Sequence, residues 1–303
     1  MKSVKKSNAK PVIKILKIVG AALGIIIFIA AIFVSVLTVT EYKPQDSEDL
    51  TVTYNDQQAT QDDSFPTDTN KLSQQKELSI GDNISVVTWN IGYGSLGANA
   101  DFFMDGGDSV YTSTKEQVLT NMSAITEELN SLSPDIILLQ EVDEKSSRSH
   151  KINEASIIKD ELPSYNSSYA YNYKTLMVPY PIPPIGQVAS GIMTLSTYPV
   201  STACRIKLPC PFSYPIRLCN LKRCLIVSKV PIDGTNKELV IVNLHLEAYD
   251  SGEGKAAQTK MLADILQAET DKGNIRKRKA DKTKMVVSRQ PIFVNLKSNT
   301  MKN

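Results

Sequence analysis

The clearest feature in the pattern of hydrophobic and polar positions is one long apolar run near the start of the chain. Residues 18–39, IVGAALGIIIFIAAIFVSVLTV, include no charged side chain. At about 1.5 Å per helical residue, such a run is long enough to cross the hydrocarbon core of a bilayer, which is roughly 30 Å thick. The run is apolar on every face, whereas the core helix of a soluble protein is usually apolar on one. The pattern therefore predicts a transmembrane helix.

The next stretch, residues 40–82, is rich in Asp, Gln, Ser, Thr and Asn and has few bulky apolar side chains. A segment of this composition buries too little apolar surface to offset the entropy lost on ordering. We expect a flexible polar tether.

Residues 83–270 have the pattern of a folded domain. Apolar runs rich in β-branched residues predict strands at residues 84–91, 135–142, 191–196, 224–231 and 239–246. Apolar positions at helical spacing predict helices at residues 114–132 and 255–269. Because strands and helices alternate early and strand pairs dominate later, we expect an α/β fold with a mixed sheet, or two packed sheets, and helices outside.

The last stretch, residues 271–303, is strongly basic and has one short apolar segment without amphipathic period. It does not resemble a continuation of the preceding domain. Such an abrupt change is typical of a frameshifted or truncated reading frame, and a divergent natural segment is the alternative. Translating the coding DNA beyond residue 273 in the other two frames would separate these interpretations.

Charges on either side of the apolar run predict its orientation. Residues 1–17 contain six lysines, whereas the residues just after the run are acidic, including Glu41 and Asp46. By the positive-inside rule the N-terminus is cytoplasmic and the domain lies outside. A cleaved signal peptide is the rival interpretation, and it also exports the domain. We favour an uncleaved signal anchor, because the run is long for a signal peptide and no small-x-small cleavage site follows.

Composition adds little to this picture. A formal net charge of +2 gives no reason to expect binding to nucleic acid.

The cysteines are clustered, but their spacing is not that of a zinc site and no histidine lies among them; they are Cys204, Cys210, Cys219 and Cys224. In an exported domain, both local disulfides and partly buried thiols remain open. Residues 165–180 form a tyrosine-rich segment, predicted as a loop, which either packs internally or contacts bases or lipid.

Three polar residues follow predicted core strands and are candidates for chemistry: Asn90, Glu141 and His245. Strand ends hold side chains rigidly while the adjoining loops leave room for substrate. A carboxylate such as Glu141 suits Mg²⁺, and His245 is able to exchange a proton with a phosphoryl oxygen. Each residue also has a plainer interpretation: a turn cap for Asn90, a surface ion pair for Glu141 and a buried core residue for His245.

Taken together, these residues carry a family resemblance. The blocks TWNI, LLQEV and NLHL, in this order, resemble the first blocks of the endonuclease/exonuclease/phosphatase superfamily. That superfamily includes sphingomyelinases, abasic-site endonucleases, pancreatic deoxyribonuclease and inositol polyphosphate phosphatases. Residues 190–200, SGIMTLSTYPV, also resemble the family block in which a glycine precedes an apolar strand, a serine and a tyrosine-proline turn. The resemblance covers about residues 84–269.

The resemblance implies a four-layered α/β sandwich, C-terminally incomplete and preceded by one transmembrane helix. It also implies hydrolysis of phosphodiesters or phosphomonoesters with Mg²⁺, or Mn²⁺ in its place. Glu141 would bind the metal, Asn90 would contact the metal shell or the phosphate, and His245 would assist at the phosphoryl centre. The expected partners are the membrane lipid bilayer and a phosphorylated substrate, which is a lipid head group, a small molecule or nucleic acid; no protein partner is predicted.

The sequence departs from the family pattern after the helix at residues 255–269. A block ending in Gly-Asp-Phe-Asn and a final Ser-Asp-His block do not occur, and the only histidines are His150 and His245. In the family, those blocks orient the attacking water and hold the phosphoryl group, and losing several members of one catalytic unit costs orders of magnitude in rate. The alternative function is therefore a catalytically inactive, truncated remnant or a binding module of the same fold.

Overall fold

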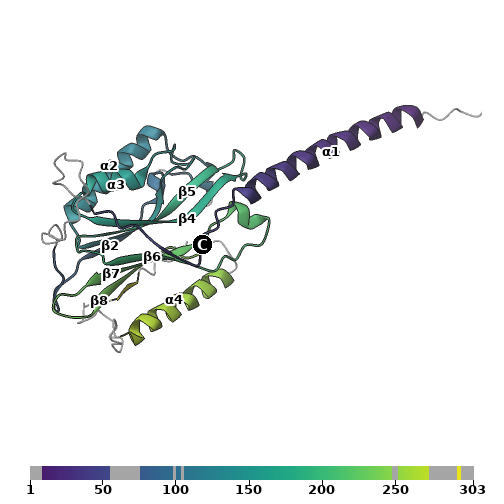
Figure 1. Ribbon diagram of the computed structural model, residues 1–303. Coiled ribbons are helices and arrows are strands. Elements are labelled where there is room, and N and C mark those ends of the chain that lie inside the picture. Colours follow the sequence, from purple (N-terminus) through teal and green to yellow (C-terminus); the bar gives the residue numbers. More distant parts are fainter. Residues whose placement is uncertain are drawn as a thin grey trace, which may run out of the picture. The chain divides into compact units, whose positions relative to one another are not determined.

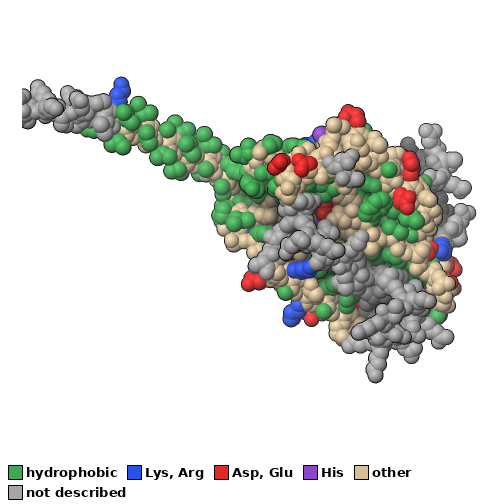
Figure 2. Space-filling model, turned by 180° about the vertical axis from the view of Figure 1, so that it is seen from behind, with side chains coloured by type: hydrophobic (Ala, Val, Ile, Leu, Met, Phe, Trp, Pro, Cys, Tyr) green, Lys and Arg blue, Asp and Glu red, His purple; other side chains and the backbone are tan. Residues whose placement is uncertain are grey.

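A computed structural model of the chain describes residues 9–54, 76–97, 100–103, 106–247, 252–272 and 292–294. It divides into two compact units, Met1–Glu41 and Tyr42–Asn303. The first unit contains helix α1, Ala9–Val39. Its segment Ile13–Val39 has a hydropathy of 2.9 and is long and apolar enough to cross a membrane, a test that a signal sequence also passes. Figure 2 shows hydrophobic side chains along this helix.

The second unit is built on two β-sheets. Within its described residues, one sheet has the strand order β2-β3-β5-β4 and the other the order β1-β6-β7-β8-β9. The strands of the first sheet are β2 Val86–Asn90, β3 Ile136–Asp143, β5 Gly186–Ser196 and β4 Asn166–Val178. Those of the second are β1 Ser47–Asp49, β6 Thr202–Lys207, β7 Cys224–Pro231, β8 Glu238–Leu244 and β9 Ile292–Val294.

Helices cover the outer face of each sheet (Figure 1). Helices α2 (Lys115–Leu132) and α3 (Glu154–Glu161) lie on the first sheet, and α4 (Glu253–Asp271) lies on the second. Short 3-10 helices η2 (Gly92–Gly94) and η4 (Ile216–Cys219) lie in connections. The layers are therefore helix, sheet, sheet and helix, which confirms the predicted α/β sandwich.

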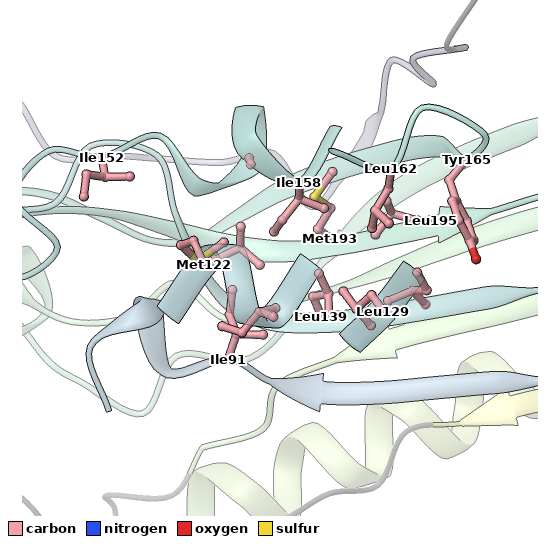
Figure 3. Packing of buried hydrophobic residues seen from close by; sticks show 14 of the residues in the cluster. Ile91, Met122, Leu129, Leu139, Ile152, Ile158, Leu162, Tyr165, Met193 and Leu195 are labelled. Carbon is pink, nitrogen blue, oxygen red and sulfur yellow. The ribbon is translucent and has the colours of Figure 1, made fainter. Parts of the chain in front are cut away.

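The period-2 pattern of the strands explains these layers. In β3, Ile137 and Leu139 pack with α2 and α3, in the cluster that Figure 3 shows, whereas Ile136 and Leu138 face the second sheet. Successive side chains of a strand point to opposite faces, so a strand covered on both faces is apolar throughout. In β8 the same alternation directs Val240 toward α4.

The structure differs from the sequence analysis at the predicted tether. Part of it is ordered on the domain, because Ser47–Asp49 forms β1 and pairs with β6. Leu50 and Val52 follow with period-2 spacing and pack against the cluster between the sheets. A short edge strand is ordered by hydrogen bonds to its neighbouring strand. The polar composition of the segment does not reveal this pairing, and so it predicts disorder. Residues 55–75 of the tether lie outside the described residues.

Three further segments correct or extend the sequence analysis. The tyrosine-rich loop is instead largely strand β4, whose tyrosines pack internally: Tyr169 Oη donates to the carbonyl of Val142, and Tyr173 Oη to that of Cys219. All four cysteines are free thiols, and burial raises the pKa of Cys224 to about 11. Within the basic tail, β9 pairs parallel to β8, so this part of the tail joins the sheet.

Candidate functional site

Two parallel strands place Asn90 and Glu141 side by side. Asn90 is in register with Gln140, the residue before Glu141. At Glu141 the pairing of β3 with β5 shifts by a β-bulge, and Glu141 has a left-handed backbone with φ of 57°. A non-glycine residue in this conformation is strained and persists only where its surroundings hold it. The bulge redirects the Glu141 side chain out of the ordinary alternation of the strand.

Asn90 fixes the carboxylate of Glu141. The Asn90 Nδ2 donates to Glu141 Oε1 at 2.8 Å, while the backbone N–H of Gly92 donates to Asn90 Oδ1 at 3.0 Å. The amide therefore caps the turn that begins η2 and also holds the glutamate. The turn cap that the sequence offered for Asn90 is therefore present, whereas its contact with a metal shell or a phosphate stays a prediction.

His245 reaches the same carboxylate from the second sheet. It follows the last residue of β8, and its Nε2 lies 3.8 Å from Glu141 Oε1. The Nδ1 atom is buried and has no hydrogen-bond partner among the residues that the structure describes. Burial, with the nearby cations Arg223 and Arg148, holds the pKa of His245 well below its usual value, so the imidazole is neutral at neutral pH. Asn90 at the end of β2 and His245 just after β8 thus converge on one carboxylate oxygen of Glu141.

Two arginines that the sequence pattern does not single out lie near this group: Arg148, whose side chain is partly buried, and Arg223, which is buried. Arg148 makes two hydrogen bonds to Asp143, at 2.9 and 3.1 Å, and a third to Ser190 Oγ at 3.1 Å. Its guanidinium also stacks on Tyr93, 3.7 Å from the ring centre. Asp143 ends β3 two residues after Glu141, so this network holds the strand end that carries Glu141.

The second arginine, Arg223, contacts the backbone of His245. Arg223 pairs with Glu247, with Nε 3.2 Å from Oε2, and donates to the backbone carbonyl of His245 at 3.2 Å. Both side chains of the pair are buried, at 1% and 0% exposure. Removing one member of such a pair would leave an uncompensated buried charge, which is strongly destabilising. The pair therefore anchors the turn on which His245 lies.

Two amides join the sheets directly behind the site. Gln140 Nε2 donates to Asn243 Oδ1 at 2.9 Å, and Asn243 Nδ2 donates to the carbonyls of Leu139 and Met193 at 3.2 and 2.9 Å. Gln140 is 3% exposed and Asn243 is fully buried. This contact fixes β8 against β3 and β5, and hence His245 relative to Glu141.

The metal-binding capacity of this site rests on one carboxylate. Among the residues that the structure describes, no three His, Cys, Asp or Glu side chains form a group able to hold a metal ion. Mg²⁺ needs only one or two protein carboxylates and keeps several waters. Glu141 has a partly exposed side chain, at 22%, and its Oε2 makes no hydrogen bond among those found in the described residues. The oxygen donors at Asn90 and Glu141 fit a hard, partly hydrated cation.

Comparison with known proteins agrees with this architecture. The sequence pattern of the Endonuclease/Exonuclease/phosphatase family matches residues 87–273, more than half of the chain. The chain belongs to this family. Its members share the fold described above, so the endonuclease/exonuclease/phosphatase resemblance is confirmed. No curated protein matches the chain.

Solved structures of the family resemble the chain at low identity. An endonuclease/exonuclease/phosphatase from Beutenbergia cavernae DSM 12333 is 18% identical, with a TM-score of 0.42 over 60% of this chain and 43% of its own. The human nocturnin catalytic domain with bound sulfate is 18% identical, with a TM-score of 0.42 over 66% and 64%. TDP2 from C. elegans is 20% identical, with a TM-score of 0.41 over 65% and 46%. The chain thus spans less than two thirds of each of these structures.

Proposed function

We propose that this chain is a membrane-anchored, Mg²⁺-dependent phosphoesterase of the endonuclease/exonuclease/phosphatase family. The observation that carries the proposal is the convergence of Asn90 and His245 on Glu141 Oε1, at 2.8 and 3.8 Å. These residues come from separate strands, and the strained backbone of Glu141 is maintained where they meet. Strain held at a cluster of polar residues supports a functional role for that cluster.

In this proposal Glu141 would hold Mg²⁺, or Mn²⁺, which would supply positive charge for the phosphoryl oxygens and the leaving group. Asn90 orients the carboxylate of Glu141 through its amide N–H. His245 is neutral, so its imidazole is able to donate a hydrogen bond to a phosphoryl oxygen or to accept a proton.

The apolar helix α1 supports the membrane part of the proposal. Most of its described side chains are exposed, as at Ile27 (67%) and Phe28 (65%), which suits lipid and not water. The lysines of residues 1–17 favour a cytoplasmic N-terminus and an extracytoplasmic domain. A phosphorylated lipid head group, a small molecule and nucleic acid are all candidate substrates.

A catalytically inactive domain is the second candidate function. It is favoured by the candidate site, to which the described part of the chain contributes one carboxylate, and by the absence of the family's Gly-Asp-Phe-Asn and Ser-Asp-His blocks from residues 1–303. In this case the domain would retain the fold and bind phosphorylated ligands without turning them over.

The deciding experiment measures hydrolysis of a chromogenic phosphodiester by the full chain in nanodiscs, with Mg²⁺ and with chelator. Glu141→Gln keeps the shape of the side chain and removes its charge, and Glu128→Gln on the exposed face of α2 is the matched control. We expect turnover that chelator and Glu141→Gln abolish and Glu128→Gln preserves. If folded protein shows no turnover, the inactive alternative replaces the proposal.

A further inference from the structure

Exposed hydrophobic side chains gather at one end of the domain. The described residues of the second unit include ten large hydrophobic side chains that are exposed, and six of them lie at this end, in the β4–β5 hairpin, in η4 and in the adjoining loops. We call these six the apolar rim: Tyr111, Leu176, Tyr180, Ile182, Tyr214 and Ile216. Ile182 is 93% exposed and Tyr180 is 72% exposed. Exposed apolar patches of this kind mark surfaces that bind another molecule or a membrane.

Hydrogen bonds tie the loops of the rim together. Strands β4 and β5 form a hairpin whose last pair is Val178 and Gly186, so Tyr180 and Ile182 lie at its tip. The Tyr111 hydroxyl donates to the carbonyls of Pro184 and Ile185 in the same tip.

The loop that carries Tyr214 and Ile216 joins the same surface. Thr175 Oγ1 of β4 donates to the carbonyl of Leu218 in η4 at 3.0 Å.

The rim lies at the same end of the sandwich as Glu141 and His245. Beside Glu141, β3 pairs with Gly191 and Ile192 of β5. The hairpin tip lies just before these residues in β5, so it extends beyond the end of β3 that carries Glu141. Helix η4 likewise lies four residues before Arg223, which donates to the carbonyl of His245. The strand ends that carry the candidate site are thus bordered by exposed apolar loops.

We propose that the apolar rim rests on the surface of the lipid bilayer that α1 spans. This inference rests on the membrane anchor of the proposed function. Tyr42, three residues after the end of α1, packs on Tyr171 of β4 with ring centres 6.0 Å apart. Three residues reach at most about 11 Å, so the domain is tethered to the membrane through the strand that leads into the rim.

The composition of the rim fits an interface with lipid head groups. Tyrosine is enriched at the boundary between hydrocarbon and water, where its ring is buried and its hydroxyl stays wet. Lys174 and Arg217 are exposed beside the rim and would meet lipid phosphates. A bilayer on this side would also face the end of the domain where Glu141 lies.

The test places a tryptophan in the rim of the full chain, reconstituted in vesicles of phosphatidylcholine and phosphatidylglycerol that include brominated phosphatidylcholine. Ile182→Trp and Tyr214→Trp report from two separate loops. Asn236→Trp is the matched control, because it is exposed in the hairpin after Pro231, at the opposite end of β7 from η4. The natural Trp89 gives a background common to all variants.

We expect brominated lipid to quench both rim variants several-fold more than Asn236→Trp, in which the fraction of emission quenched should match that of the wild type. Equal quenching in all variants would overturn the inference. A shift in rim emission that depends on protein concentration and not on bromine would mean that a second copy of the chain covers the rim, and would also overturn it. Flotation of the protein with the vesicles tests the membrane anchor separately. Hydrolysis of a soluble phosphodiester tests the proposed catalytic activity.

Discussion

Asn243 is one of the side chains that hydrogen-bond the two sheets to each other, beside Arg205 of β6, which donates to the carbonyl of Tyr171 in β4. Asn243→Leu tests how much the contacts of Asn243 contribute. The substitution keeps the number and branching of the side-chain heavy atoms but removes three hydrogen bonds, one accepted from Gln140 and two donated to backbone carbonyls. At about 1 kcal/mol net for each buried hydrogen bond, we expect the free energy of unfolding to fall by about 3 kcal/mol. For a domain of this size that corresponds to a melting temperature about 6–12 °C lower.

Urea unfolding of the full chain in detergent, followed through the fluorescence of the single tryptophan Trp89, measures this change. Asn236→Leu, in an exposed hairpin, is the matched control and should change the unfolding free energy by less than about 0.5 kcal/mol. Combining Asn243→Leu with Gln140→Leu should cost less than the sum of the two single changes, because both remove the same contact. A loss below about 1 kcal/mol for Asn243→Leu, or strict additivity, would refute the reasoning.

Three further predictions concern buried charges near the site. Burial, with the neighbouring Asp143, raises the pKa of Glu154 well above its usual value. The folded state therefore binds the proton more tightly than the unfolded state, and the free energy of unfolding falls as pH rises from about 4.5 toward the folded pKa. Glu154→Gln should remove this fall when unfolding is measured against pH in the presence of chelator. An unchanged pH profile would contradict the prediction. Arg148→Lys should lower stability by about 2 kcal/mol, because lysine lacks the fork that bonds Asp143 twice, and calorimetry showing no change would exclude this role. Glu247→Gln should cost about 3 kcal/mol in urea unfolding by leaving Arg223 buried with a neutral partner, whereas a neutral effect would mean that water reaches the guanidinium.

The sequence by itself determined the layered architecture and the position of the candidate residues along the chain. The period-2 and apolar runs at residues 84–91, 135–142, 224–231 and 239–246 became β2, β3, β7 and β8, and both predicted helices of the domain formed as α2 and α4. These elements are long and strongly patterned, because each is buried on at least one face. The blocks around Asn90, Glu141 and His245 were sufficient to predict the family, since each block combines a core strand with the polar residue at its end.

Only the tertiary structure decided which side chains meet. The approach of His245 to Glu141 depends on the packing of one sheet on the other, and the contact between Gln140 and Asn243 that fixes this packing joins residues about 100 positions apart. A local pattern of residues cannot predict a contact between positions so far apart in the sequence. The same holds for β1, which is polar and short, and whose stability comes from pairing with the edge of β6. Arg148 lies in a loop and has no periodic signature, because its partners Asp143, Ser190 and Tyr93 are brought together by three different segments of the fold.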